Sequence, residues 1–252
     1  MSLLERVRAD KLRHDAQLAL EGVGDPAQAP PPRDLLAALN GPDLAWIAEV
    51  KRRSPSRGEI RPGADPVAIA QSYEAAGAAA ISVLTDLPRF GGSLDDLRAV
   101  RAAVDIPVVR KDFLVSPRMV REARVATADS CLLIVAMLSD EELVACMDEA
   151  RRLGMEPLVE VHDGPELDRA LAAGVRILGV NNRDLHSLAI DLATSETLLA
   201  RVPAGVVKVA ESGIHTVADR DRMRAAGADA LLVGTSLMTA PDPGAALAAL
   251  RG

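Results

Sequence analysis

The chain has 252 residues, of which 49% are hydrophobic, 26% charged and 2% aromatic, and its formal net charge is −7. This composition is typical of a globular protein with an aliphatic core, and the lack of a basic block argues against a nucleic-acid partner. Cys131 and Cys146 have no metal-binding spacing, and no apolar signal region or membrane-length stretch is present, so we expect a cytoplasmic protein with no membrane partner.

The N-terminal part predicts a short helical extension. Residues 3–20 have a helical pattern, residues 22–32 form a Pro-rich connector, and residues 33–39 predict a second short helix. So short a segment could hardly hold a core of its own. We therefore expect residues 1–44 to pack on the domain formed by residues 45–252 and not to form a separate domain.

From about Ala45 onward, short apolar runs alternate with helical patterns. Near-continuous apolar runs are typical of parallel strands buried on both faces. Repeated βα units in about 210 residues favour one closed (β/α)₈ barrel, a TIM barrel. An open doubly wound sheet is the alternative, but it would usually have a Gly-rich turn after the first strand, where this chain has Arg52-Arg53-Ser54-Pro55-Ser56. The predicted strands are residues 47–51, 79–84, 107–111, 131–135, 157–160, 177–181, 206–211 and 231–233.

The predicted helices carry recognisable start and stop signals. Asp65-Pro66 and Ser116-Pro117 place a capping residue before a proline, and Ser139 to Glu142 reads as a capping box, with a weaker one from Thr216 to Asp219. A glycine stands where each of several helices gives way to the next strand, which supports a repeated unit. These glycines are Gly77, Gly154, Gly174 and Gly227.

Charged and polar residues stand at the downstream ends of the apolar runs. Residues two apart on a strand share a face, and a barrel active site lies at the carboxyl ends of its strands. One mouth is therefore predicted to gather Glu49, Lys51, Lys111, Glu160, Asn181 and Glu211. Lys208 has the opposite parity to Glu211 and is assigned to the outer face. Ion pairs that hold the rim together are the structural alternative, but buried pairs stabilise poorly against apolar replacements, so a set this large favours a site. The desolvation of a lysine balanced by nearby carboxylates would suit a general acid near neutral pH.

Two glycine-containing turns predict a phosphate site. Glu211-Ser212-Gly213-Ile214 ends the seventh strand and Gly234-Thr235-Ser236 ends the eighth, which is the usual phosphate position of this barrel. Glycine lets backbone amides approach an oxyanion closely, and a helix that starts just after adds a favourable dipole. Ordinary turn glycines are the alternative.

Other features are less specific. The loop from Arg52 to Pro66 is long and charged and is a candidate mobile lid. Phe90 could line a ring-binding pocket or only pack in the core. The histidines, at positions 14, 162, 186 and 215, offer no metal spacing, and His162 is interpreted as a rim histidine.

The strand-end motifs resemble those of the indole-3-glycerol phosphate synthase family. The match runs in order through all the predicted strands, from about residue 45 to 240, and the combination is specific where a single piece would not be. It is carried by Glu49-Val50-Lys51-Arg52-Arg53-Ser54-Pro55-Ser56, Ser82-Val83-Leu84-Thr85-Asp86, Phe90-Gly91-Gly92-Ser93, Arg110-Lys111-Asp112-Phe113, Leu132-Leu133-Ile134-Val135, Gly154-Met155-Glu156-Pro157-Leu158-Val159-Glu160-Val161, Gly179-Val180-Asn181-Asn182-Arg183-Asp184-Leu185, Val209-Ala210-Glu211-Ser212-Gly213-Ile214 and Leu232-Val233-Gly234-Thr235-Ser236-Leu237-Met238.

The resemblance implies a reaction of tryptophan biosynthesis and a role for each matching residue. The substrate would be 1-(2-carboxyphenylamino)-1-deoxyribulose 5-phosphate, an anionic sugar phosphate, and the products indole-3-glycerol phosphate, CO₂ and water, with no cofactor or metal. Lys111 would be the general acid of ring closure, Lys51 would hold the carboxylate and could act as an acid in the dehydration, and Glu160 would take or relay a proton there. Glu49, Asn181 and Glu211 would orient these groups. The implied phosphate contacts are Ser54, Ser212, Gly213, Gly234 and Thr235, and the implied contacts to the aromatic ring and its carboxylate are Phe90, Phe113, Leu132, Arg183 and Leu185.

The chain departs from the family pattern at two matched positions. Thr127 stands where the family usually has glycine before the fourth strand, which concerns local geometry and not catalysis. Thr235 stands where the family often has serine or glutamate, and a backbone amide contact would survive that change.

Three other functions are the alternatives. Another phosphate-binding barrel enzyme, such as the sugar isomerase one step earlier, would want a thiol or a carboxylate pair where this chain has Glu49 and Lys51. A non-catalytic ligand sensor would have lost a catalytic acid or base, whereas every expected acid or base position is filled in this sequence. A Schiff-base aldolase would use Lys111 as a nucleophile, which borohydride trapping would detect. We expect a monomer or a weak homo-oligomer.

Overall fold

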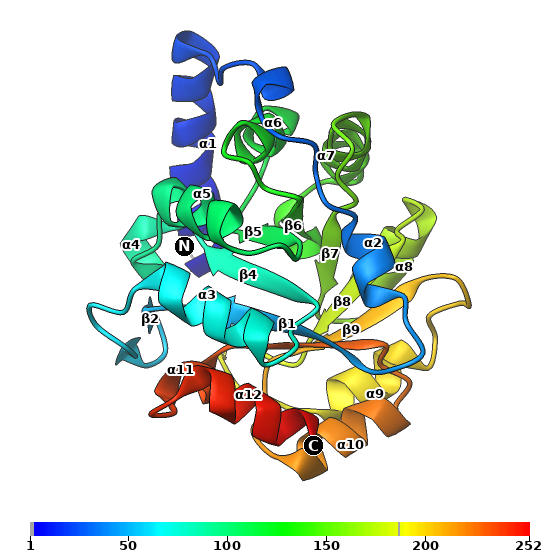
Figure 1. Cartoon of the computed structure of the whole chain (residues 1–252). Coiled ribbons are helices and arrows are strands. Elements are labelled where there is room, and N and C mark those ends of the chain that lie inside the picture. The colour runs from blue at the N-terminus through cyan, green and yellow to red at the C-terminus, as the bar shows by residue number, and fades with distance from the viewer. Residues whose placement is uncertain (1–2, 186) are drawn as a thin grey trace.

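A closed barrel of parallel strands forms the centre of the molecule. The computed structural model describes residues 3–185 and 187–252, and within them eight parallel strands close in the order β1-β10-β9-β8-β7-β6-β5-β4 (Figure 1). The predicted (β/α)₈ barrel is therefore confirmed, and the open sheet is wrong. The barrel strands are β1 (Ala45–Val50), β4 (Ala80–Leu84), β5 (Val108–Lys111), β6 (Ser130–Ile134), β7 (Leu158–Val161), β8 (Ile177–Asn181), β9 (Val207–Glu211) and β10 (Ala230–Val233).

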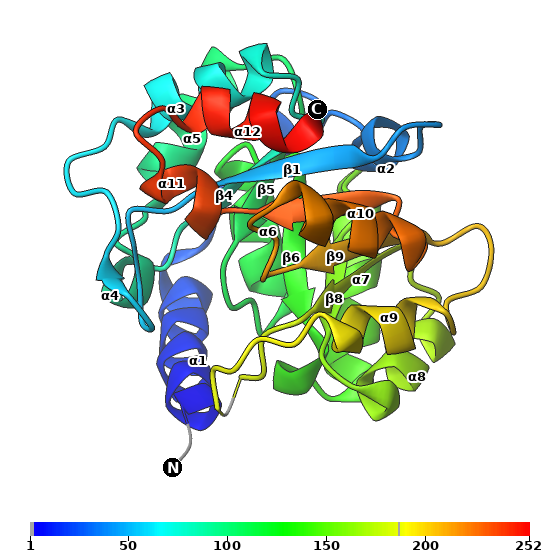
Figure 2. The same cartoon turned by 90° about the horizontal axis from the view of Figure 1, so that it is seen from below.

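Helices surround the barrel, and the barrel helices follow its strands in chain order (Figures 1 and 2). None of the helices in the described ranges is long and apolar enough to cross a membrane. The helices on and around the barrel are α3 (Pro66–Ala75), α4 (Leu87–Phe90), α5 (Leu94–Ala103), α6 (Pro117–Val125), η2 (Val135–Met137), α7 (Asp140–Arg152), α8 (Gly164–Ala172), α9 (Ala193–Leu199), α10 (Val217–Ala225), α11 (Thr235–Thr239) and α12 (Pro243–Arg251).

The start and stop signals act as the sequence predicts. Asp65 caps α3 through the amide of Val67, and Ser116 caps α6 through that of Met119. Both capping boxes are complete, at α7 and also at α10, where the sequence signal is weaker. The four predicted stop glycines all have φ between 75° and 90°, the left-handed region that favours glycine.

The strand register places the polar strand ends side by side. Glu49 pairs with Ser82 across β1 and β4, Glu160 with Gly179 across β7 and β8, and Asn181 with Glu211 across β8 and β9. Partners in a parallel pair lie on the same face of the sheet, so these side chains share the barrel interior. Below them the interior is filled by fully buried residues such as Ile47 and Val209.

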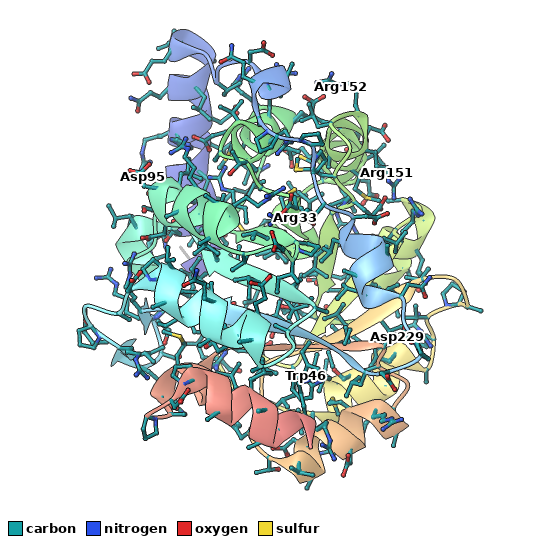
Figure 3. The ribbon with its side chains drawn as sticks, in the orientation of Figure 1. Arg33, Trp46, Asp95, Arg151, Arg152 and Asp229 are labelled. Atoms are coloured by element: carbon teal, nitrogen blue, oxygen red, sulfur yellow. The ribbon has the colours of Figure 1, made fainter. Side chains whose placement is uncertain are left out.

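The segment before the barrel contains α1 (Leu3–Glu21), η1 (Pro26–Gln28) and α2 (Leu35–Leu39). Val7 on α1 and Leu39 on α2 are almost completely buried in the main core. The backbone amide of Arg33 donates to Asp129 at 2.8 Å, and the Arg33 guanidinium donates to the carbonyl of Ile106 at 2.8 Å; Figure 3 labels Arg33 where it approaches the barrel. This segment therefore makes both apolar and polar contacts with the barrel.

Several small elements are absent from the sequence predictions. The loop from Arg52 to Pro66 contains a hairpin of β2 (Arg53–Ser54) and β3 (Gly58–Glu59), and α4 follows β4 directly. The predicted strand at 131–135 ends at Ile134, because Val135 begins the short helix η2. Position 186 lies outside the described residues.

Candidate active site

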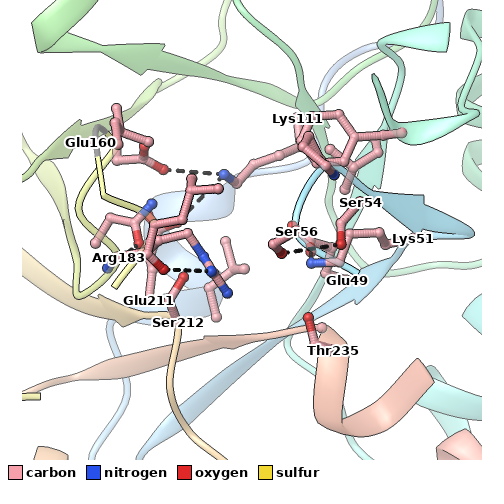
Figure 4. Close-up of a pocket in the computed structure, with 18 of the residues that line it drawn as sticks. Glu49, Lys51, Ser54, Ser56, Lys111, Glu160, Arg183, Glu211, Ser212 and Thr235 are labelled. Carbon is pink, nitrogen blue, oxygen red and sulfur yellow. Dashed lines mark hydrogen bonds and ion pairs between the residues drawn. The ribbon is translucent and has the colours of Figure 1, made fainter. Parts of the chain in front are cut away.

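A cavity opens at the carboxyl ends of the barrel strands, and every predicted site residue lines it. Figure 4 shows Glu49, Lys111, Glu160 and Glu211 projecting into it from different strands. Lys208 is not among the described residues that line the cavity, as its parity predicts. The residues brought together are Glu49, Lys51, Ser54, Phe90, Lys111, Phe113, Leu132, Glu160, Asn181, Arg183, Leu185, Glu211, Ser212, Gly213, Gly234 and Thr235.

Lys111 is the centre of the charged cluster. Its Nζ atom lies 3.1 Å from Glu160 Oε2 and 3.6 Å from Glu211 Oε2. The side chains of both glutamates are 2% exposed, whereas the lysine, which reaches the cavity, is 14% exposed. A lysine held by carboxylates from two other strands is well placed to donate a proton to a molecule in the cavity.

The charges in this cluster shift one another's pKa. Burial by itself lowers the pKa of Lys111, but the carboxylates of Glu160, Glu211 and Glu49 outweigh burial and raise that pKa above its ordinary value. Burial favours a higher pKa for Glu160, yet Lys111 and His162 hold its pKa well below the usual range. The resting site therefore contains a charged lysine and an ionised Glu160. The sequence predicts that desolvation and nearby carboxylates balance in setting the pKa of Lys111. In the structure the carboxylates outweigh desolvation.

The pKa of Glu211 is shifted in the opposite direction to that of Glu160. Burial, and then the negative charge of Glu160, raise the pKa of Glu211 to about 8 against the opposing charge of Lys111. Its Oε1 atom is buried and has no hydrogen-bond partner among the described residues. Glu211 is therefore easier to protonate than Glu160, and in its protonated form it can donate a hydrogen bond into the site.

Two strand-end glycines make room for these carboxylates. A Cβ atom at Gly179 would lie 2.2 Å from Glu211 Oε1, and one at Gly234 would lie 2.4 Å from Glu49 Oε1. Glu49 in turn pairs with Lys51 Nζ at 2.5 Å. Any side chain at either glycine would displace a carboxylate from its lysine.

The turns after β9 and β10 form the opposite wall of the cavity. Ser212 and Gly213 have φ of 67° and 84°, and Ser236 Oγ donates to the carbonyl of Ile214 at 2.9 Å, which ties the two turns together. No described side chain caps the start of α11 at Gly234. Backbone amides at this start are therefore available to an anion.

An apolar and cationic region completes the cavity. The rings of Phe90 and Phe113 lie 6.2 Å apart at an interplanar angle of 33°. Arg183 is held by its own amide, which donates to Asn181 Oδ1 at 3.0 Å, and by its guanidinium, which donates to the carbonyl of Leu188 at 3.0 Å. This wall suits an aromatic ring that carries a carboxylate.

Several residues that line the cavity are not predicted from the sequence. Leu4 and Val7 reach the cavity from α1, and Lys11 on the same helix pairs with Asp86 at 2.8 Å and Asp112 at 2.6 Å. No sequence motif marks this contribution, because it depends on where α1 docks. Also missed are Ser56 and Arg57 in the hairpin, and Leu188, Ile190 and Ile214 in the later loops.

His162 is more than a rim residue. Its Nε2 atom lies 3.2 Å from Glu160 Oε1, and its Nδ1 atom lies 3.0 Å from Glu166 Oε2. Burial lowers its pKa, but the close carboxylates of Glu160 and Glu166 outweigh burial and raise the pKa to about 10. Within the described ranges, no cluster of His, Cys, Asp and Glu could hold a metal ion.

The fold and the site define a (β/α)₈-barrel enzyme with an acid–base cluster at the carboxyl ends of its strands. A family model described as indole-3-glycerol phosphate synthase matches residues 3–250. The chain belongs to the indole-3-glycerol phosphate synthase family.

Individual relatives are similar in sequence to this chain over almost its whole length. A protein of Parafrankia sp. named indole-3-glycerol phosphate synthase is 51% identical over 96% of this chain and 90% of its own length. Proteins of the same name from Mycolicibacterium gilvum and Mycobacterium tuberculosis H37Rv are 50% and 49% identical, over 99% of this chain and 92% of their own length.

Solved structures with low sequence identity share the fold alone. A 3-hexulose-6-phosphate synthase has a TM-score of 0.62 at 19% identity and covers 82% of this chain and 98% of its own. A thiamine phosphate pyrophosphorylase from Pyrococcus furiosus has a TM-score of 0.61 at 18% identity and covers 86% of this chain and 96% of its own.

Proposed function

We propose that the cavity closes the indole ring of 1-(2-carboxyphenylamino)-1-deoxyribulose 5-phosphate and releases indole-3-glycerol phosphate, CO₂ and water. The observation that carries this function is the position of Lys111 between Glu160 and Glu211 in a chain of the synthase family. The activity is that of a carboxy-lyase of tryptophan biosynthesis. Family membership favours it over the isomerase, the sensor and the aldolase.

The substrate is held at both of its anionic ends. The phosphate binds at the two turns, through Ser212, Gly213, Gly234 and Thr235, with Ser54 facing them from the hairpin. The geometry that supports this placement is the pair of tied turns and the uncapped start of α11 among the described residues.

The aromatic end lies against the opposite wall. Phe90, Phe113, Leu132 and Leu185 pack on the ring, and Lys51 and Arg183 bind its carboxylate. Holding the ring carbon beside the sugar carbonyl makes the carbon–carbon bond formation effectively unimolecular, which is worth several kcal/mol, at most roughly 7–11.

Lys111 protonates the carbonyl oxygen as the ring carbon attacks it. The ammonium group is charged in the resting site, and its contacts with Glu160 and Glu211 hold it at the cavity. Loss of CO₂ then restores the aromatic ring and leaves a hydroxyl group on the new five-membered ring.

Dehydration completes the indole. Lys51 supplies the proton with which the hydroxyl group leaves as water, and Glu160 takes the proton that the ring loses. Glu49 orients Lys51 through their contact at 2.5 Å, and Glu211 and Asn181 orient Lys111 and the sugar hydroxyls.

The direct test is to mix the purified protein with the carboxyphenylamino sugar phosphate and follow indole fluorescence. A product that co-elutes with indole-3-glycerol phosphate is the expected result. The wild-type protein giving no product would refute the function, and a borohydride-trapped adduct on Lys111 would favour the aldolase.

We also propose that the protein acts in the cytoplasm as a monomer or a weak homo-oligomer. Its acidic net charge of −7 supports the absence of a nucleic-acid partner. Light scattering after size exclusion measures the oligomeric state, and a tight oligomer at micromolar concentration would contradict the proposal.

A further inference from the structure

The proposed reaction consumes a proton that the buried site must obtain from solvent. Carbonyl protonation and departure of water each take a proton, and the ring returns one to Glu160, so each turnover has a net uptake of one proton. The substrate fills the cavity while this happens. Since Glu160 is 1% exposed, a supply of protons that does not pass through the cavity would be useful.

His162 touches Glu160 from the side opposite Lys111. Glu160 faces Lys111 Nζ with Oε2, at 3.1 Å, and His162 Nε2 with Oε1, at 3.2 Å. His162 follows β7 directly, whereas its second partner, Glu166, lies in the first turn of α8. The result is a continuous series of ionisable groups: Glu166, His162, Glu160 and Lys111.

The hydrogen bonds define where the protons lie on the histidine ring. Glu166 Oε2 accepts the backbone N–H of His162 at 2.8 Å and also lies 3.0 Å from Nδ1, so Nδ1 carries a proton. Nε2 then faces a carboxylate oxygen, and a bare lone pair there would be repelled. One more proton must therefore lie between Nε2 and Glu160.

The contact between Nε2 and Glu160 is close but not aligned. Nε2 is buried and, among the described residues, has no partner with hydrogen-bond geometry, although Glu160 Oε1 is within ion-pair distance. Such a ring can release its proton without breaking a well-formed hydrogen bond first.

The other edge of His162 faces a separate surface. His162 lines an open depression outside the active-site cavity together with Asp163, Asp191, Thr194 and Thr197. The side chain of His162 is 10% exposed, and that of Glu166 is 15% exposed. The partner Glu166, whose carboxylate contacts Nδ1, favours a protonated ring.

We propose that His162 is a positioning residue that relays protons from this depression to Glu160 and, through Glu160, to Lys111. In each cycle the Nε2–H bond breaks and an O–H bond forms on Glu160 Oε1. The carboxyl group then turns this oxygen toward the neutral Lys111, which at rest faces Oε2 at 3.1 Å, and the proton passes to Nζ. The imidazole ring, then neutral, turns Nε2 toward the depression and takes a proton from water or a buffer acid. After the product leaves, Glu160 gives up the proton that it took from the substrate and Lys51 regains one from water in the open cavity, so the net uptake stays at one proton per turnover. This relay rests on the proposed function, because the net proton uptake belongs to that reaction.

The first test is the His162→Gln variant, which keeps a polar side chain but cannot relay. We expect kcat to fall roughly 10–100-fold, below the 10²–10⁴ of a group that touches substrate, with KM changed less than about twofold. His14→Gln is the matched control, because His14 also pairs with a glutamate, Glu122 at 2.9 Å, but lies away from the cavity. An unchanged kcat in His162→Gln beside an active wild-type protein would overturn the relay alone. An inactive wild-type protein would overturn both proposals.

The second test separates proton transfer from packing. In His162→Ala, added imidazole should restore activity, and 1,2,4-triazole, which has similar size but stays neutral at pH 7.5, should not. Equal rescue by both azoles, or by neither, would overturn the relay. A measurement on the wild-type protein covers the case in which the variants do not fold: nitrogen NMR at pH 8 should show His162 doubly protonated, and a neutral ring would overturn the relay.

Discussion

Replacing Gly179 by alanine would separate Glu211 from Lys111 without a substitution at either residue. The new Cβ would lie 2.2 Å from Glu211 Oε1 and 3.3 Å from Leu158 Cδ1. Gly179 lies inside β8 and does not have a positive φ, so alanine costs nothing in backbone conformation. The effect therefore comes mainly from the displaced carboxylate, with a smaller shift of Leu158.

The size of the effect follows from the geometry. A Cβ at 2.2 Å must push the carboxylate away by about 1 Å, and overpacking of this kind in a core costs roughly 1–3 kcal/mol. The 3.6 Å contact between Glu211 and Lys111 is lost as well. Misplacement by about 1 Å costs up to 10²-fold in rate, so we expect kcat to fall roughly 10–100-fold.

The assay measures urea unfolding and steady-state kinetics on the wild type and three variants. Gly41→Ala is the control, because Gly41 is exposed, and its Cβ would meet no atom of the described residues within 4 Å. The free energy of unfolding of this variant should stay within about 0.5 kcal/mol of wild type. Gly179→Ala combined with Glu211→Asp, which withdraws the carboxyl group, should recover part of the lost stability. Wild-type stability and kcat in Gly179→Ala would refute the argument that this glycine exists to seat Glu211.

Three further predictions concern the acid, its neighbour and a strained helix end. Lys111→Met should lower kcat by about 10²–10⁴ with little change in KM, and near-normal turnover would count against Lys111 as the acid. The pKa of Glu211 is raised from 4.5 to about 8, so the folded protein binds more protons than the unfolded chain between these values, and its stability falls as pH rises through them. This loss of stability is at most about 5 kcal/mol between pH 5 and 9, and Glu211→Gln should remove it. Urea unfolding at a series of pH values measures it; the same pH dependence of the unfolding free energy in both proteins would contradict the prediction. Thr127 has a φ of 70°, and Thr127→Gly should stabilise the protein by about 0.5–1 kcal/mol in thermal unfolding; a loss of stability would show that the threonine side chain offsets the strain.

The barrel could be predicted because its signals are local and repeated. Each strand is an apolar run of the right length, and each stop glycine marks a change of backbone direction that a side chain would resist. The parity of Lys208 and Glu211 separates the outer face from the inner one in both sequence and structure. The positions of the site residues follow from the same rule, whereas their roles stay predictions.

The elements that could not be predicted depend on long-range packing. The β2–β3 hairpin is held by a short ladder between Arg53 and Glu59, which no apolar alternation announces. Leu4 and Val7 line the cavity only because α1 docks beside its mouth. A helical pattern in the sequence does not say which surface the helix will cover.

The closed barrel and the set of ionisable groups at its mouth follow from the pattern of the chain, because strand periodicity and chain order decide which side chains face inward and at which end. How those groups share protons depends on the fold. Whether a carboxyl group is ionised depends on distances of a few ångströms and on burial, and these place Glu160 between Lys111 and His162 while they raise the pKa of Glu211.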